Sequence, residues 1–256
     1  MSAALVSLQG VDKRFDSGTQ ALAGVSLTVA PGEFVTLLGP SGCGKSTVLR
    51  LAAGLEQASA GSVDAPALRG GTAETAFVFQ DATLMPWASV ADNVWLPLRL
   101  AGQPRKQAQP RIERALATVG LGDVATAYPN QLSGGMKMRV SIARALVTKP
   151  EVLLMDEPFA ALDEITRFKL NNDLLELWHA SNFTVVFVTH SVFESVFLSQ
   201  RIVTMAARPG RVIADMDVSA PYPRAVDYRT SPLYNAHCKR ASDALERAMG
   251  HAIGAH

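Results

Sequence analysis

A glycine-rich segment at residues 39–47 has the residue types of a phosphate-binding loop. It has the GxxxxGK[ST] spacing and lies between an apolar run and a helical pattern. Glycines let successive backbone N–H groups point at phosphate oxygens, and the following helix adds its positive amino end. We expect Lys45 to reach the β- and γ-phosphates of a nucleotide and Ser46 to coordinate magnesium. The alternative is a strand-to-helix turn that binds nothing. The expected phosphate-contacting residues are Gly39, Pro40, Ser41, Gly42, Cys43, Gly44, Lys45, Ser46 and Thr47.

Two interpretations of Cys43 are open from the sequence. Backbone amides of the loop give it an electropositive setting, which favours a reactive thiolate. A small apolar side chain at this position can also simply fill space. The two interpretations differ in whether alkylation of the thiol blocks nucleotide binding.

An apolar run at residues 152–155 ends in two adjacent carboxylates, Asp156 and Glu157. Side chains alternate along a strand, so the two carboxylates point in different directions and can take different tasks. We expect Asp156 to support a magnesium ion and Glu157 to polarise an attacking water. Alone, the run could equally be an ordinary strand-to-loop exit. Together with the phosphate loop it predicts hydrolysis of a nucleoside triphosphate.

Apolar runs and helical patterns alternate along the chain, which predicts a parallel sheet flanked by helices. Alternating segments at 5–11 and 25–29 predict an antiparallel edge. Runs that are apolar on both faces, as strands covered from two sides are, occur at residues 33–38, 76–79, 152–155 and 184–189.

The helical patterns gather in the middle of the chain, where residues 111–119 are amphipathic. We expect one ATPase-type domain over residues 1–220 with a helical subdomain inserted at about 88–147. Residues 221–256 are expected to form a tail with a helix over 234–249. Trp87 and Trp95 are expected to pack within the helical insert.

The composition excludes several classes of protein. With 24 Lys and Arg against 23 Asp and Glu, the net charge of +1 offers no field for nonspecific binding of nucleic acid. No apolar run approaches the roughly 18 residues of a membrane helix, and residues 1–10 do not resemble a signal peptide. The two cysteines, Cys43 and Cys238, have no zinc-type spacing. We expect a globular protein with reduced thiols.

Several further motifs resemble those of a known protein family. Leu-Ser-Gly-Gly at residues 132–135 resembles the signature motif of ATP-binding cassette (ABC) ATPases, and the resemblance extends over residues 3–215 with every motif in the family's order. It implies an α/β P-loop NTPase core with an antiparallel β subdomain and an inserted helical subdomain. The other matching positions are Gln80 in the glutamine loop, Asp163 in the D-loop, His190 as the switch histidine and Phe15 as the aromatic that stacks on adenine.

The resemblance implies ATP and Mg²⁺ as cofactors, with Ser46, Gln80 and Asp156 near the metal. Hydrolysis would rest on Glu157, His190 and Lys45. Without the family context, His190 could be structural and Phe15 could be a core residue. The signature residues Ser133, Gly134 and Gly135 would face ATP held by a second copy, so that two ATP molecules lie in a head-to-tail dimer.

The resemblance also implies membrane partners. Permease subunits would dock near Gln80 and residues 81–87, a substrate-binding protein would act indirectly, and no nucleic acid is involved. The chain would lie peripherally on the cytoplasmic side of the cell membrane.

Segments at 79–87, 155–163 and 208–211 resemble importers of the nitrate, sulfonate and taurine group. This implies the ATP-hydrolysing subunit of an importer for a small anionic or sulfonate-like solute. One alternative is an importer of a pyrimidine vitamin precursor or a riboflavin-type solute. Others are a soluble ABC protein of DNA repair or translation and a cassette that binds ATP without turnover. Departures from the family at Lys137, Met138, Ser191 and Gln200 remove no phosphate, metal or base function.

Overall fold

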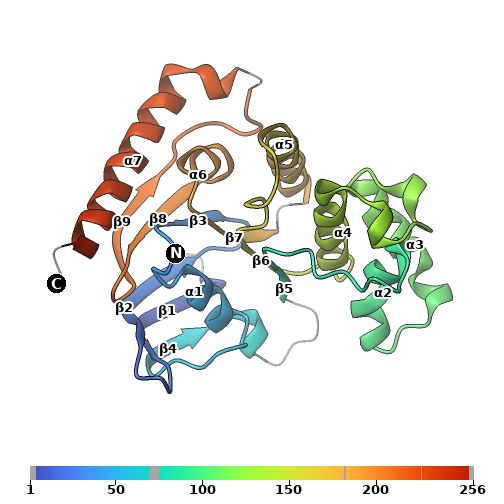
Figure 1. The fold of residues 1–256 in the computed structure, drawn as a ribbon, viewed down its shortest axis with the longest axis horizontal. Coiled ribbons are helices and arrows are strands. Elements are labelled where there is room, and N and C mark those ends of the chain that lie inside the picture. The colour runs from blue at the N-terminus through green and yellow to red at the C-terminus, as the bar shows by residue number, and fades with distance from the viewer. Residues whose placement is uncertain (1–3, 70–74, 182, 226, 254–256) are drawn as a thin grey trace.

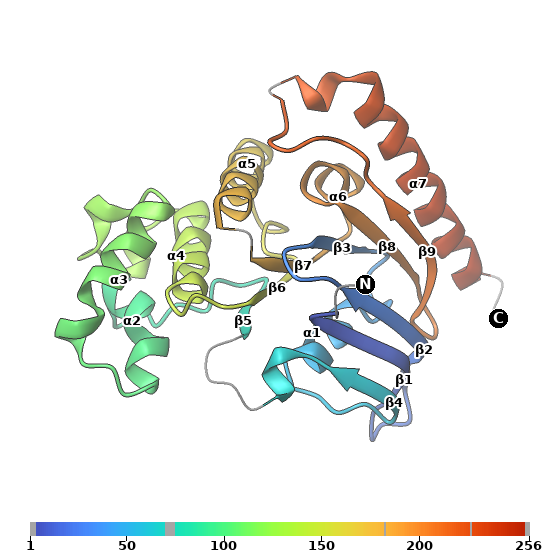
Figure 2. The same ribbon diagram turned by 180° about the vertical axis from the view of Figure 1, so that it is seen from behind.

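The computed structural model describes residues 4–69, 75–181, 183–225 and 227–253. Figures 1 and 2 show a large sheet at the centre, a smaller antiparallel sheet beside it, and a group of helices beyond one edge of the large sheet. None of the helices in the described ranges combines the length and apolar content needed to cross a bilayer.

The large sheet has the order β5-β6-β7-β3-β8-β9, and its first five strands are parallel. The four parallel strands expected at 33–38, 76–79, 152–155 and 184–189 are therefore confirmed, whereas β8 was not predicted. The last strand, β9, runs antiparallel to β8 and was not predicted. The strands are β3 (Phe34–Leu38), β5 (Thr75–Val78), β6 (Val152–Asp156), β7 (Thr184–Thr189), β8 (Arg201–Ala206) and β9 (Arg211–Asp217).

Helices cover both faces of this sheet, which explains why its strands are apolar on both sides. Leu153 and Met155 of β6 belong to one core, together with residues of α5 and α6. Val152 and Leu154 belong to a second core that includes α1 and the smaller sheet. Each such burial stabilises the fold by about 1.5–3 kcal/mol. The covering helices are α1 (Lys45–Ala52), α5 (Glu164–Ser181) and α6 (Val192–Leu198).

The smaller sheet is antiparallel and has the order β2-β1-β4. Strands β1 (Val6–Arg14) and β2 (Gln20–Val29) pair as predicted, with Val6 opposite Val29. They do not form the sheet alone, because β4 (Ala60–Asp64) pairs with the other edge of β1. β4 was missed because four of its five residues are exposed and it carries no alternating apolar pattern.

Three helices, α2 (Val90–Leu100), α3 (Arg105–Thr118) and α4 (Gly134–Leu146), form the helical lobe beyond β5. They lie within the range expected for the inserted subdomain; the domain bounds themselves stay a prediction. Trp95 packs in this lobe as expected, and its indole N–H donates to the carbonyl of Gln103. The same expectation for Trp87 is wrong, because this side chain is 78% exposed.

The tail helix α7 (Pro232–Ile253) packs along β8 and α6. It begins two residues earlier than predicted because Pro232 suits the first helical position and the Ser231 hydroxyl accepts from the N–H of Tyr234. The described chain also has short 3₁₀ turns at Pro66–Leu68, Gly122–Val124, Pro129–Gln131 and Tyr228–Thr230.

Candidate nucleotide site

The phosphate loop joins β3 to α1, as predicted, and two of its glycines are required by geometry. A Cβ on Gly39 would lie 2.5 Å from the carbonyl oxygen of Met205 and 2.7 Å from the Cys43 sulfur. Gly44 precedes α1 with a φ of 89°, in the left-handed region that favours glycine. The loop is thus packed tightly against the end of β8, which fixes where its N–H groups lie.

Lys45 is almost completely buried at the start of α1, with 4% of the residue exposed. Its ammonium donates hydrogen bonds to the carbonyl oxygens of Gly39 (2.8 Å) and Pro40 (2.9 Å). It also lies 3.7 Å from a carboxylate oxygen of Glu157. The charge is therefore held inside the loop, next to the expected base.

Ser46 and Asp156 meet across two elements. The Ser46 hydroxyl, on the first turn of α1, donates a 2.8 Å hydrogen bond to Oδ1 of Asp156 at the end of β6. Burial raises the pKa of the Asp156 carboxyl, and the hydrogen bond from Ser46 opposes this effect. The pair offers oxygen atoms only, the ligands that magnesium prefers.

Glu157 follows Asp156 with a φ of 46°, a conformation that is strained for a residue with a side chain. Its N–H donates to the carbonyl of Val188 on β7, which stabilises this turn. One carboxylate oxygen faces Lys45, and the other lies 3.0 Å from Nδ1 of His190. His190 itself directly follows β7 and is 55% exposed. The strained turn thus aims Glu157 between a fixed cation and an imidazole.

A cleft of about 630 Å³ lies against these groups. Its volume is within the usual range of small-molecule sites, and its walls come from both sheets, the phosphate loop and the segment after β5. The cleft is lined by Phe15, Thr19, Gln20, Ala21, Ser41, Gly42, Gly44, Lys45, Ser46, Thr47, Gln80, Asp156, Glu157 and Arg208.

The cleft unites most of the predicted site residues, but not all of them. Phe15 is half-buried and lines the cleft, rather than the core. His190 reaches the site through Glu157. Gly39, Pro40 and Cys43 form the inner side of the loop, where the N–H of Cys43 donates to the carbonyl of Pro40 at 3.3 Å.

The structure favours one of the two interpretations of Cys43. The residue is 0% exposed, and burial raises the pKa of its thiol even though Lys45 acts in the opposite direction. We therefore expect Cys43 to be a packing residue beneath the loop rather than a reactive thiolate.

Arg208 lines the cleft and was not predicted as a site residue. It lies in the turn between β8 and β9, two residues before Gly210. A Cβ on Gly210 would lie 2.4 Å from the carbonyl oxygen of Cys43 and 2.7 Å from that of Ala21, so this turn packs directly on the phosphate loop. The sequence signals for this turn were Gly210 and the resemblance of the segment 208–211, and neither indicated a contact with the phosphate loop.

The signature residues lie apart from the cleft of their own chain. Ser133 is exposed and caps α4, accepting from the N–H of Met136, and Gly134 is exposed beside it. Gly135 is buried, and a Cβ there would lie 2.5 Å from Cγ2 of Thr166. The start of α4 therefore rests on the first turn of α5, while its outer face is open.

Glu194 was missed by the sequence reasoning. It lies on α6 and accepts a hydrogen bond from the Thr189 hydroxyl, directly before His190. Its other oxygen lies 3.7 Å from Nε of Arg167, and neither of these two atoms has a hydrogen-bond partner. Arg167 in turn donates to the carbonyl of Leu162, beside Asp163. A partly buried ion pair thus joins α5 to α6, and its two members also bind the segments before these helices.

Comparison with known proteins agrees with this geometry. The ABC transporter family model matches residues 22–160. A protein of Brucella abortus named as an ATP-binding protein is 46% identical over 94% of this chain and 93% of its own length. The aliphatic sulfonates import ATP-binding protein SsuB of Bacillus subtilis is 41% identical over 88% of this chain and 87% of its own. A SsuB protein of Xanthomonas axonopodis is 44% identical over 88% and 90%, respectively.

Two solved structures share the fold. One is an ATP-binding cassette in a dimeric, post-hydrolysis state with ADP and Pi; its TM-score is 0.74 at 32% identity, covering 84% of this chain and 100% of that one. The other is cbiO1 of Clostridium perfringens, part of the ABC transporter complex cbiONQ, with a TM-score of 0.77 at 25% identity and 98% of each chain covered. The ABC ATPase fold expected from the motifs is confirmed, and the chain belongs to the family of ABC transporter ATP-binding proteins, which bind and hydrolyse ATP.

Proposed function

We propose that this chain powers an importer for a small anionic or sulfonate-like solute. The observation that carries the ATPase part is the placement of Glu157 between Lys45 and His190 at the mouth of the cleft. The solute class is supported by relatives of 41% and 44% identity that are named as aliphatic sulfonates import proteins.

The residues at the cleft fit a magnesium ion that is bound together with ATP. Ser46, Asp156 and the side-chain carbonyl of Gln80 would supply oxygen ligands. The described residues contain no group of three His, Cys, Asp or Glu side chains that could hold a metal ion. When bound, magnesium neutralises charge on the β- and γ-phosphates.

The hydrolytic step uses the three groups around Glu157. Its carboxylate accepts the proton of a water whose oxygen bonds to the γ-phosphorus, while the bond between the γ-phosphorus and the bridging oxygen of ADP breaks and ADP leaves. His190 orients the carboxylate through the contact at 3.0 Å. Lys45 moves its hydrogen bonds from the loop carbonyls to the phosphate oxygens and stabilises the charge there. Phe15 stacks on the adenine at the far end of the cleft.

A second copy of the chain completes the site in this proposal. Ser133 and Gly134 are exposed at a helix start and lie outside their own cleft, so their N–H groups are free to meet a phosphate of a partner subunit. The related cassette with ADP and Pi is a dimer.

The segment between β5 and α2 is the proposed contact for permease subunits, which would place the chain on the cytoplasmic face of a membrane. The guanidinium of Arg144, on α4, donates to the carbonyls of Ala82 and Thr83, each at 2.8 Å. Gln80 at one end of the segment lines the cleft, and Trp87 at the other end is exposed. A partner that touches Trp87 is therefore linked both to the nucleotide and to the signature helix.

Reconstitution tests the whole proposal. The chain is expressed with its cognate permease and binding protein in proteoliposomes, and ATP turnover is measured with an alkanesulfonate, nitrate or a pyrimidine vitamin precursor. We expect stimulation by the first two classes; stimulation by the pyrimidine alone would reject the solute class. Trp87→Ala should abolish co-purification with the permease. Leu55→Ala, at an apolar residue that is 60% exposed elsewhere, is the matched control.

A further inference from the structure

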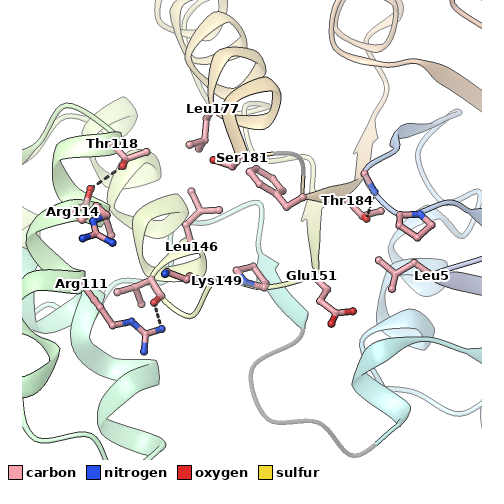
Figure 3. A pocket seen from close by; sticks show the side chains of 16 residues that line it. Leu5, Arg111, Arg114, Thr118, Leu146, Lys149, Glu151, Leu177, Ser181 and Thr184 are labelled. Atoms are coloured by element: carbon pink, nitrogen blue, oxygen red, sulfur yellow. Dashed lines mark hydrogen bonds between the residues drawn. The ribbon is translucent and has the colours of Figure 1, made fainter.

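A second cavity, of about 640 Å³, lies at the opposite ends of the strands of the large sheet from the nucleotide cleft. The nucleotide cleft is at the carboxyl end of β6, where Asp156 and Glu157 stand, whereas this cavity is at the amino ends of β6 and β7, at Glu151 and Thr184. Figure 3 shows that it opens between the helical lobe on one side and the end of α5 with the sheet on the other. No step of the proposed hydrolysis uses it.

The walls of this cavity are mostly apolar. Leu146 at the end of α4 and Leu177 near the end of α5 both border the cavity, and Ala115, Val147 and Phe183 also line it. The volume is within the range of sites that enclose small organic molecules. The cavity can therefore take an aliphatic body of several carbon atoms.

Three cationic side chains, Arg111, Arg114 and Lys149, stand at the helical-lobe side of the cavity. The Arg111 guanidinium is fixed in place because it donates to the Gln103 side chain (3.3 Å) and to the carbonyl of Val147 (2.6 Å). In the described part of the chain, Arg114 and Lys149 have no carboxylate within 4.0 Å. Among the described residues that line the cavity, Glu151 is the one acidic residue, and Figure 3 shows its carboxylate directed away from Arg114.

Lys149, one of the three cationic residues at the cavity, has an unusual backbone conformation. Lys149 has a φ of 57° and its N–H donates to the carbonyl of Leu146, so it occupies the left-handed position that ends α4. Glycine or asparagine is the usual residue there. A lysine at this position brings an ammonium to the rim of the cavity at some cost in backbone strain.

We propose that this cavity binds a small amphipathic anion, with a sulfonate or carboxylate head at Arg111, Arg114 and Lys149 and a short alkyl chain between Leu146 and Phe183. The ligand needs both a charged head and an apolar body, because the cationic side chains alone would bind any small anion and the apolar wall alone would bind any small apolar molecule. This site is separate from the nucleotide cleft and does not depend on which solute the proposed importer carries.

The position of the cavity gives the ligand a route to the reaction. Helix α4 begins at the signature residues and ends at Leu146, and α5 begins after Asp163 and ends at Ser181. Both helices therefore start where the proposed dimer site lies and finish at this cavity. An anion that contacts both ends holds the helical lobe against α5.

Calorimetry with purified protein and hexanesulfonate as the probe tests the proposal. We expect saturable binding to one site with a Kd of about 0.1–1 mM, as ligand efficiency allows for a molecule of this size. Methanesulfonate should bind at least about tenfold more weakly because five methylene groups are lost. Hexyltrimethylammonium should not bind, and saturating ATP should not compete.

Variants place the probe in the cavity. Arg114→Gln and Lys149→Asn should each weaken hexanesulfonate binding about fivefold, as for a partly exposed charge pair. Asparagine keeps the left-handed backbone, so that loss of folding does not confuse the result. Lys106→Gln, which removes an exposed cation on α3 outside the cavity, is the control and should leave the Kd unchanged.

Three results would each overturn the proposal: absence of saturable binding, equal affinity of the two cavity variants and the wild type, or displacement of hexanesulfonate by ATP. The last result would place the anion in the nucleotide cleft instead. Thermal melting of each variant, measured alongside, should show Tm values within a few degrees of the wild type.

Discussion

Nδ1 of His190 lies 3.0 Å from Oε2 of Glu157, although the two residues come from different strands of the sheet. The contact exists because β6 and β7 are parallel neighbours, so that their carboxyl ends meet at one edge. Thr189, the residue before His190, is fixed in turn by Glu194. The carboxylate of Glu157, the proposed base, is therefore positioned by the packing of two strands and one helix rather than by its own loop alone.

We expect His190→Ala to lower the kcat for ATP about 10–100-fold while the KM for ATP changes little. The imidazole orients Glu157 and does not line the cleft, so its loss affects the transition state more than ground-state binding. Steady-state phosphate release measures both constants. A large rise in KM with an unchanged kcat would contradict a role in orienting the base.

Ser46→Ala should raise the magnesium concentration needed for half-maximal ATP binding, because the oxygen pair at 2.8 Å is broken. Binding of a fluorescent ATP analogue, titrated with Mg²⁺, provides the measurement. Thr47→Ser, which retains a hydroxyl at the neighbouring cleft residue, is the control. Identical magnesium curves for Ser46→Ala and the wild type would remove Ser46 from the proposed metal site.

Asp156→Asn should increase thermal stability while it abolishes magnesium-dependent turnover. Burial raises the pKa of this carboxyl in the folded chain, so its ionised form is less favourable there than in the unfolded chain. The Asp156→Asn variant should therefore exceed the wild type in stability by the largest margin at a pH above the raised pKa of Asp156 in the folded chain. This difference in stability should disappear as the pH falls to 3.8, the ordinary pKa of an aspartate, because the wild-type carboxyl is then protonated in both states. Calorimetric melting between pH 4 and pH 8 tests this sign; a gain that grows on acidification would contradict it.

The pair of Arg167 and Glu194 should act as a unit. We expect Glu194→Gln and Arg167→Met each to lower kcat about threefold to tenfold with little change in KM. The fall in kcat of the double variant should be smaller than the product of the two single falls, which corresponds to a coupling energy of about 0.5–3 kcal/mol. Lys169→Met, at an exposed cation of the same helix, is the control. Strictly additive effects would show that the contact at 3.7 Å carries no coupling.

Cys43 should resist alkylation in the folded protein, since the thiol is fully buried and its pKa is raised. Treatment with iodoacetamide, followed by mass spectrometry, is expected to leave Cys43 unmodified until denaturant is added. Cys43→Ser is expected to retain ATP binding. Rapid stoichiometric labelling that ATP prevents would restore the reactive-thiolate interpretation.

The sequence predicted the parts of the site whose chemistry is local. The phosphate loop and the pair Asp156 and Glu157 are contiguous motifs at strand ends, where residue type and spacing carry the information. Four parallel strands, β3, β5, β6 and β7, were predicted because burial on both faces leaves continuous apolar runs. The parallel strand β8 was missed although it is also buried.

Other features depend on contacts between distant segments and leave weaker signals. Strands β4 and β9 are largely exposed or half-buried, so they show no strong pattern. Arg208 enters the cleft only because Gly210 packs on the phosphate loop, and Glu194 meets Arg167 only because α5 and α6 lie side by side. Trp87 was misassigned because an exposed tryptophan cannot be told from a buried one by residue type.

The most direct test of the account is the turnover and ATP affinity of Glu157→Gln, measured with the permease present. We expect kcat to fall about 10²–10⁴-fold, the usual contribution of a positioned general base, while ATP still binds and a dimer accumulates. Gln keeps the size of the side chain and removes only its ability to accept a proton. Near-normal hydrolysis in this variant would contradict the assignment of the base and, with it, the proposed mechanism.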